Sequence, residues 1–313
     1  MSCWPSRLPS TRPTPSTPAR SSSRRLHLRS DMSDYERGTV TLSNGDHLSY
    51  IKQGSGPVVV LLPGWSQSAA QWKHQIDDLA QDHTVYALDL RGHGESANSS
   101  GGYRIARLAA DLREALELAD LDDVTLMAHS MGCSVVWAYL EHYGTDRISR
   151  LILVDQAPMV TGKPWLTDEE KVTYGCLFPD AAALEGFVTA VNATDTVDGH
   201  KEIIRGMFTA DIDEDTLAWI AEQNLMMPRG SAADLLWDHC LQDWRDVIVD
   251  IDLPTLVIGA EKSIFSAESQ RWIADQNANA SVVIFEESDG GSHFMFFENP
   301  DRFNRHVREF LNA

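Results

Sequence analysis

The sequence predicts an α/β fold, with a mostly parallel sheet, helices on both faces, and a helical cap inserted after the strand that ends at Asp155. Two observations carry this prediction. Short segments that are apolar almost throughout alternate with helical segments, as in parallel sheets buried on both faces. This alternation stops after Pro158 and resumes near Leu253, and the chain between them has a helical pattern rich in aromatic residues.

The composition fits a soluble globular enzyme, with 43% apolar and 23% charged residues among 313. The formal net charge is −20, and we expect no nucleic-acid partner because phosphate binding needs clustered Lys and Arg. No stretch reaches the roughly 18 consecutive apolar residues of a transmembrane helix. We therefore expect neither a membrane span nor a membrane partner.

The cysteines lie far apart, without CxxC or metal-ligand spacing. We expect free thiols in a reducing compartment, which favours a cytoplasmic protein, and we expect no zinc or other metal. The cysteines are Cys3, Cys133, Cys176 and Cys240.

Residues 1–31 are rich in Ser, Thr, Pro and Arg, and predict a disordered basic arm. They lack the apolar run of a secretion signal or membrane anchor. The arm is open to three interpretations, namely a transit-like segment, a functional basic tail, or an extension upstream of a domain that begins near Met32. We favour the last.

The core is predicted over residues 32–159 and 251–313, and the cap over residues 160–250. Alternating segments around Asn44-Gly45 predict a β-hairpin, and the last helix is expected over residues 300–311. Some aromatic and methionine side chains of the cap are expected to line an apolar pocket. The other core elements are the apolar strands VVVLL, TVYALDL, DVTLMAH, RLILVD, PTLVIGA and SVVIFEE, and a helix over residues 105–118.

Ser130 follows a predicted buried strand and begins a helix, which is the setting of a nucleophile elbow. Such a tight turn needs small neighbours, and Ala128 and Gly132 provide them. The Met131 N–H then lies at the helix N-terminus, where an oxyanion is favoured. A second oxyanion donor is expected from the Trp65 N–H in the loop LPGW. The neighbouring His129 is expected to point elsewhere, with substrate contact as the alternative.

His293 lies in the glycine-rich segment GGSHF before the last helix, and we expect it to act as the base for Ser130. The acid is harder to place, because Lys262 stands where a serine hydrolase usually has an Asp. Asp155 ends the strand after the one that carries Ser130, so its carboxylate is expected at the same sheet edge and within reach of His293. Glu261 is the rival candidate.

The order Ser130, Asp155, His293, with the motifs LPGW, RGHGES and AHSMG, resembles the α/β-hydrolase superfamily over residues 38–313. Serine at the elbow excludes subfamilies with an Asp nucleophile, such as haloalkane dehalogenases and epoxide hydrolases. LPGW in place of a His-Gly motif, the acid after LILVD, and GGSHF ahead of NPDR together look like the cofactor-independent 3-hydroxy-4(1H)-quinolone 2,4-dioxygenases.

This resemblance implies that His293, held by Asp155, removes the 3-hydroxyl proton of a bound 2-alkyl-3-hydroxy-4(1H)-quinolone. The anion then reacts with O₂ without any cofactor, and ring cleavage releases carbon monoxide and an N-acylanthranilate. Ser130 would hydrogen-bond the small, apolar, aromatic substrate, and the Trp65 and Met131 amides would stabilise negative charge. The family has a histidine where this chain has Gln67, which can bind a heterocycle but cannot carry a proton.

Two alternatives remain open. In the first, Ser130 is an ordinary nucleophile, and the protein is an esterase or amidase for a small apolar acyl substrate, with Asp155 and His293 completing the triad. In the second, the protein is a receptor that binds its ligand without turnover. The sequence leaves a monomer and a homodimer equally open.

Overall fold

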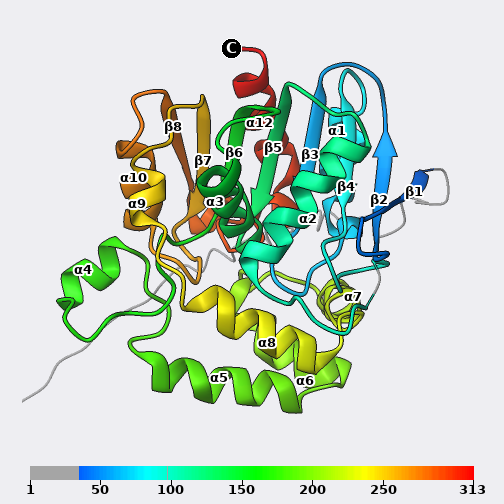
Figure 1. The fold of residues 1–313 in the computed structure, drawn as a ribbon. Coiled ribbons are helices and arrows are strands. Elements are labelled where there is room, and N and C mark those ends of the chain that lie inside the picture. Colours follow the sequence, from blue (N-terminus) through cyan, green and yellow to red (C-terminus); the bar gives the residue numbers. More distant parts are fainter. Residues whose placement is uncertain (1–34, 97) are drawn as a thin grey trace, which may run out of the picture. The chain divides into compact units, whose positions relative to one another are not determined.

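The computed structural model describes residues 35–96 and 98–313, and the predicted basic arm of residues 1–31 lies outside them. The core is an eight-stranded sheet in the order β1-β2-β4-β3-β5-β6-β7-β8 (Figure 1). The strands are β1 (Glu36–Thr41), β2 (His47–Gln53), β3 (Val58–Leu62), β4 (Thr84–Leu88), β5 (Val124–His129), β6 (Ile148–Val154), β7 (Thr255–Ala260) and β8 (Ala280–Phe285).

Only the first part of the sheet is antiparallel. β1 and β2 form the predicted hairpin, and Gly45 adopts a φ of 85° in its turn, a conformation that glycine tolerates without a steric penalty. β2 also pairs antiparallel with β4, whereas β3 to β8 pair in parallel. The prediction of a mostly parallel sheet is therefore confirmed. All six residues of β5 are buried, as expected for a strand covered on both faces.

Helices lie on both faces of this sheet (Figure 1). α2 and α3 pack against each other, and α1 packs against α12. The helices predicted over residues 105–118 and 300–311 are observed with those bounds. The helices of the core are α1 (Lys73–Leu79), α2 (Ile105–Leu118), α3 (Met131–Tyr143), α10 (Ala267–Asp275), α11 (Met295–Glu298) and α12 (Pro300–Leu311).

The chain between β6 and β7 is helical, and most of it lies beyond the carboxyl ends of the parallel strands (Figure 1). In the described part of the chain, no helix is long and apolar enough to cross a membrane. The helices of this segment are α4 (Asp168–Thr173), α5 (Ala181–Ala193), α6 (Val197–Ile204), α7 (Glu214–Asn224), α8 (Arg229–Cys240) and α9 (Arg245–Ile248).

Candidate active site

Ser130 lies at the turn between β5 and α3, and its backbone is strained. It has φ 52° and ψ −128°, a region that residues with a side chain rarely adopt. The Ser130 N–H donates a hydrogen bond to the Val154 carbonyl at 2.8 Å, which helps to hold the turn. Gly132 lets α3 approach the end of β3, because a Cβ there would lie 2.8 Å from the Pro63 carbonyl oxygen. This is the geometry of the predicted nucleophile elbow.

The structure brings Ser130, His293 and Asp155 together in one hydrogen-bonded series. Nε2 of His293 lies 3.1 Å from the Ser130 Oγ, and its Nδ1 lies 2.6 Å from the Asp155 Oδ2. All three side chains are buried. The rival Glu261 is exposed, and its backbone N–H pairs with Phe285. Asp155 is therefore the carboxylate that contacts the histidine.

Burial sets the proton affinities of this series. Burial lowers the pKa of His293 to about 3, so the imidazole is neutral at neutral pH and its Nε2 can accept the Ser130 proton. Burial raises the pKa of Asp155, and the hydroxyl of Ser263 opposes that shift by donating a hydrogen bond. The arrangement provides a hydroxyl, a base for it, and a group that orients the base.

Two backbone N–H groups are free to serve an oxyanion beside Ser130. Within residues 35–96 and 98–313, neither the Trp65 nor the Met131 N–H has a hydrogen-bond acceptor. The Trp65 indole instead points into the cap, where its Nε1 donates to the Ala232 carbonyl at 2.8 Å. Trp65 thus links the loop after β3 to α8, in addition to offering its amide.

Gln67 and His129 occupy different positions relative to the pocket. The Gln67 Oε1 accepts the Gly64 N–H at 2.9 Å and contacts the His129 Nδ1 at 2.9 Å. This orients the Gln67 amide NH₂ group, and Gln67 lines the pocket. His129 does not line it, because its ring is fully buried and its Nε2 contacts the His293 carbonyl at 2.8 Å. The structure therefore gives His129 contacts that position Gln67 and His293, rather than a place beside substrate.

The pocket in front of Ser130 is narrow and mainly apolar. Its free volume is about 60 Å³, whereas pockets for drug-sized ligands hold about 300–1,000 Å³. Side chains of the cap must therefore move before such a ligand enters. The apolar lining consists of Trp65, Val160, Leu177, Phe178, Phe187, Ile204, Met207, Leu236, Ile264, Phe265 and Phe294, and the remaining lining residues are Gln67, Ser130, Asn224, His239, Cys240 and His293.

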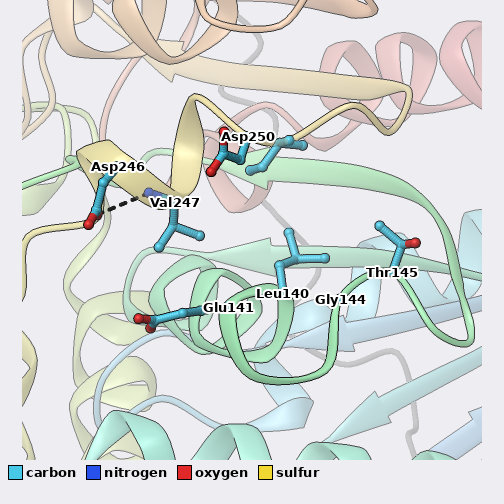
Figure 2. Close-up of a pocket in the computed structure, with 8 residues that line it drawn as sticks. Leu140, Glu141, Gly144, Thr145, Asp246, Val247 and Asp250 are labelled. Carbon is cyan, nitrogen blue, oxygen red and sulfur yellow. Dashed lines mark hydrogen bonds between the residues drawn. The ribbon is translucent and has the colours of Figure 1, made fainter.

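A larger cavity of about 370 Å³ lies between the C-terminal end of α3 and α9 (Figure 2). Its charged side chains are the carboxylates of Glu141, Asp246 and Asp250, and no histidine lines it. Among the residues that the structure describes, no group of three or more His, Cys, Asp or Glu side chains is arranged to hold a metal ion. This cavity offers neither a base beside a nucleophile nor a metal site, so the smaller pocket at Ser130 is the candidate active site.

Three residues of the site were missed from the sequence. Ser263 follows β7 and bonds to Asp155, and its position in the loop that usually carries the acid was the available signal. Asn224 and His239 line the pocket from α7 and α8. No local pattern marks them, because their place depends on how the cap packs on the core.

Comparisons with known proteins agree with this fold. Residues 57–182 match the family described as alpha/beta hydrolase fold. The chain is 28% identical to the non-heme chloroperoxidase CPO-A1 of Kitasatospora aureofaciens, over 87% of this chain and 98% of that protein. A local match covers 37% of this chain and 40% of the soluble epoxide hydrolase of Corynebacterium sp. (strain C12), at 37% identity.

Two solved structures share the fold across most of their length. The bromoperoxidase from Bacillus anthracis has a TM-score of 0.79 at 24% identity, over 89% of this chain and 100% of that one. The esterase EaEST from Exiguobacterium antarcticum has a TM-score of 0.79 at 22% identity, over 88% of this chain and 99% of that one. Likeness at these identities establishes the architecture alone.

Proposed function

Because this chain has the α/β-hydrolase fold, we propose that it is a serine hydrolase that cleaves carboxylic esters with a small, mainly apolar acyl group. The observation that carries the proposal is the series Ser130–His293–Asp155, with contacts of 3.1 Å and 2.6 Å. The sequence relative named as a non-heme chloroperoxidase supports this assignment over a quinolone dioxygenase, and the fold is shared with a bromoperoxidase and an esterase.

The proposed reaction has two half-reactions, the acylation of Ser130 and its deacylation, and His293 acts as a base and then as an acid in each. His293 accepts the Ser130 proton as the hydroxyl oxygen attacks the ester carbonyl, and the Trp65 and Met131 N–H groups stabilise the resulting oxyanion. The imidazolium then gives its proton to the departing alcohol, which leaves an acyl group on Ser130. Water, deprotonated by His293, attacks this acyl group, and the imidazolium returns the proton to the Ser130 oxygen as the acid leaves. Asp155 holds the productive tautomer throughout.

The first test is whether Ser130 becomes acylated. Hydrolysis of p-nitrophenyl butanoate should be measurable, a fluorophosphonate should label Ser130, and Ser130→Ala should lower kcat by about a thousandfold or more because the nucleophile is lost. Ser281→Ala, at an exposed position of β8, is the matched control and should retain wild-type kcat. Labelling elsewhere, or equal turnover by Ser130→Ala, would contradict the proposal.

A cofactor-independent 2,4-dioxygenase remains the second candidate. It is supported by Asp155 after β6 in contact with His293, a feature of the resemblance noted above, and by a narrow, mainly apolar pocket. It predicts oxygen uptake and stoichiometric carbon monoxide release from a 2-alkyl-3-hydroxy-4(1H)-quinolone in the presence of a chelator. In that case Ser130→Ala would keep a large part of the activity, whereas His293→Ala would lose nearly all of it.

A further inference from the structure

We propose that His239 is a second polar anchor of the active-site pocket, and that the substrate is an ester carrying a neutral hydroxyl or keto group away from its scissile bond. This inference rests on the serine-hydrolase proposal and extends it from a plain apolar ester to a polar-substituted one. His239 lies on α8 and lines the same pocket as Ser130.

The imidazole of His239 is buried without a hydrogen bond. The residue is only 4% exposed. Among residues 35–96 and 98–313, its Nδ1 is buried with no hydrogen-bond partner, and its Nε2 makes no hydrogen bond. Buried polar side chains in folded proteins are nearly always paired, and an unpaired one calls for an explanation. A polar group of a bound molecule would provide the missing partner.

The other polar residues of the pocket that we compare with His239 each make at least one side-chain hydrogen bond. Ser130 and His293 bond to each other, and Gln67 is held by Gly64. Asn224 also lines the pocket, but its side chain already bonds to Gln71 and His200. The same pocket is lined mainly by apolar side chains, among them Leu236 and Phe187. Of these polar residues, only Gln67 also has an unpaired group, its amide NH₂, and Gln67 follows β3 of the core, whereas His239 lies on α8 of the cap. An unpaired imidazole in a mainly apolar wall favours a substrate with a matching polar substituent on that side.

The charge state of His239 indicates which substituent fits. Burial lowers its pKa to about 3, so the ring is neutral at neutral pH and has one N–H donor and one acceptor nitrogen. A carboxylate would find no counter-charge there, whereas a hydroxyl or keto oxygen can bond to a neutral imidazole without burying a charge. A plain alkyl chain would leave the ring unpaired.

The test compares pairs of esters that differ in one hydroxyl or keto group. One series carries the group along the hexanoyl chain of p-nitrophenyl esters, and the other carries it on the alcohol of hexanoate esters, with hydrolysis followed by proton release. Wild-type protein should prefer the polar member of at least one pair by about tenfold or more in kcat/KM. His239→Leu should remove this preference, so that the ratio of kcat/KM between the polar and the plain ester of that pair falls to about one.

His239→Phe, which keeps a flat ring, serves as a second variant, and thermal melting verifies that both variants are folded. His142→Leu is the matched control, because His142 is exposed on α3. If the esters are hydrolysed but no His239 variant changes the ratio of kcat/KM between the polar and plain members of any pair, the inference is wrong. The hydrolase assignment then still stands. If no ester is cleaved and the fluorophosphonate does not label Ser130, the hydrolase assignment fails and the inference fails with it.

Discussion

Three non-glycine residues with positive φ stand at the carboxyl ends of neighbouring strands. Ser66, Ser130 and Asp155 have φ values of 61°, 52° and 51°, in loops that follow β3, β5 and β6. Such conformations each cost about 1–3 kcal/mol and persist where the surroundings enforce them. Here they turn the chain sharply, so that an oxyanion loop, a hydroxyl and a carboxylate converge on one imidazole.

At this scale the identity of the acid is testable. Asp155→Asn should lower kcat by about 10²- to 10⁴-fold, because an amide no longer holds the His293 tautomer with Nε2 free to accept a proton. Glu261→Gln should change kcat by less than about twofold, since Glu261 is exposed and makes no contact with His293. Steady-state kinetics of both variants decide the matter, and the opposite ranking would mean that Glu261 is the acid.

At the scale of elements, α8 is hydrogen-bonded to the loop after β3 of the core. Trp65 donates to Ala232, and Arg229 donates to the Ser66 Oγ at 2.9 Å. Within the cap, Asp243 accepts from Lys163 and from both Nε and Nη2 of Arg245 at 2.8 Å.

The ion pairs of Asp243 predict a pH-dependent stability. Its hydrogen bonds from Arg245 and Lys163 hold the pKa of Asp243 well below its ordinary 3.8 in the folded protein. The stabilisation is therefore complete above about pH 4 and is lost as pH falls toward the folded-state pKa. Asp243→Asn should lower the free energy of unfolding by about 1 kcal/mol at pH 7, with the gap to wild type narrowing below pH 4.

Urea unfolding at several pH values measures this difference in the free energy of unfolding between wild type and Asp243→Asn. Asp198→Asn is the matched control, because Asp198 is almost fully exposed and lies 3.8 Å from Lys201, so its effect should be small at every pH. If the difference in the free energy of unfolding between wild type and Asp243→Asn stays constant down to pH 2, the charge of the Asp243 carboxylate is not what stabilises the cap.

At the scale of the whole molecule, charge favours neutral substrates. Residues 1–31 hold six Arg and one Asp, and without them the 26 basic and 46 acidic residues fall to 20 and 45, a net charge of −25. A strongly acidic protein repels anions before they reach the site, and salt screens this repulsion.

A carboxylate-bearing ester should therefore have a kcat/KM that rises about threefold or more when ionic strength increases from about 10 to 500 mM. An isosteric neutral ester should show little change, because it has no net charge for the field to act on. Initial rates at low substrate concentration measure both. An equal response of the two esters would mean that the field of the protein does not influence substrate entry.

Local chemistry determined much of this protein from its sequence alone. Apolar runs, the Asn44-Gly45 turn and the small residues around Ser130 specify the strands, the hairpin and the elbow, because each depends on residues close together in the chain. Asp155 and His293 were also expected to meet, since both follow strands that end at one sheet edge, although Glu261 could not be excluded on that basis.

The tertiary structure alone decided the remaining points. Asp155 and His293 lie 138 residues apart, and only the packed sheet shows that their side chains touch. The placement of His129 depends on its contacts with Gln67 and His293 in other loops of the core, and the placement of His239 in the pocket wall depends on how the cap packs on the core. Such contacts leave no periodic trace in the sequence, because burial and pairing at these positions are properties of the assembled core and cap.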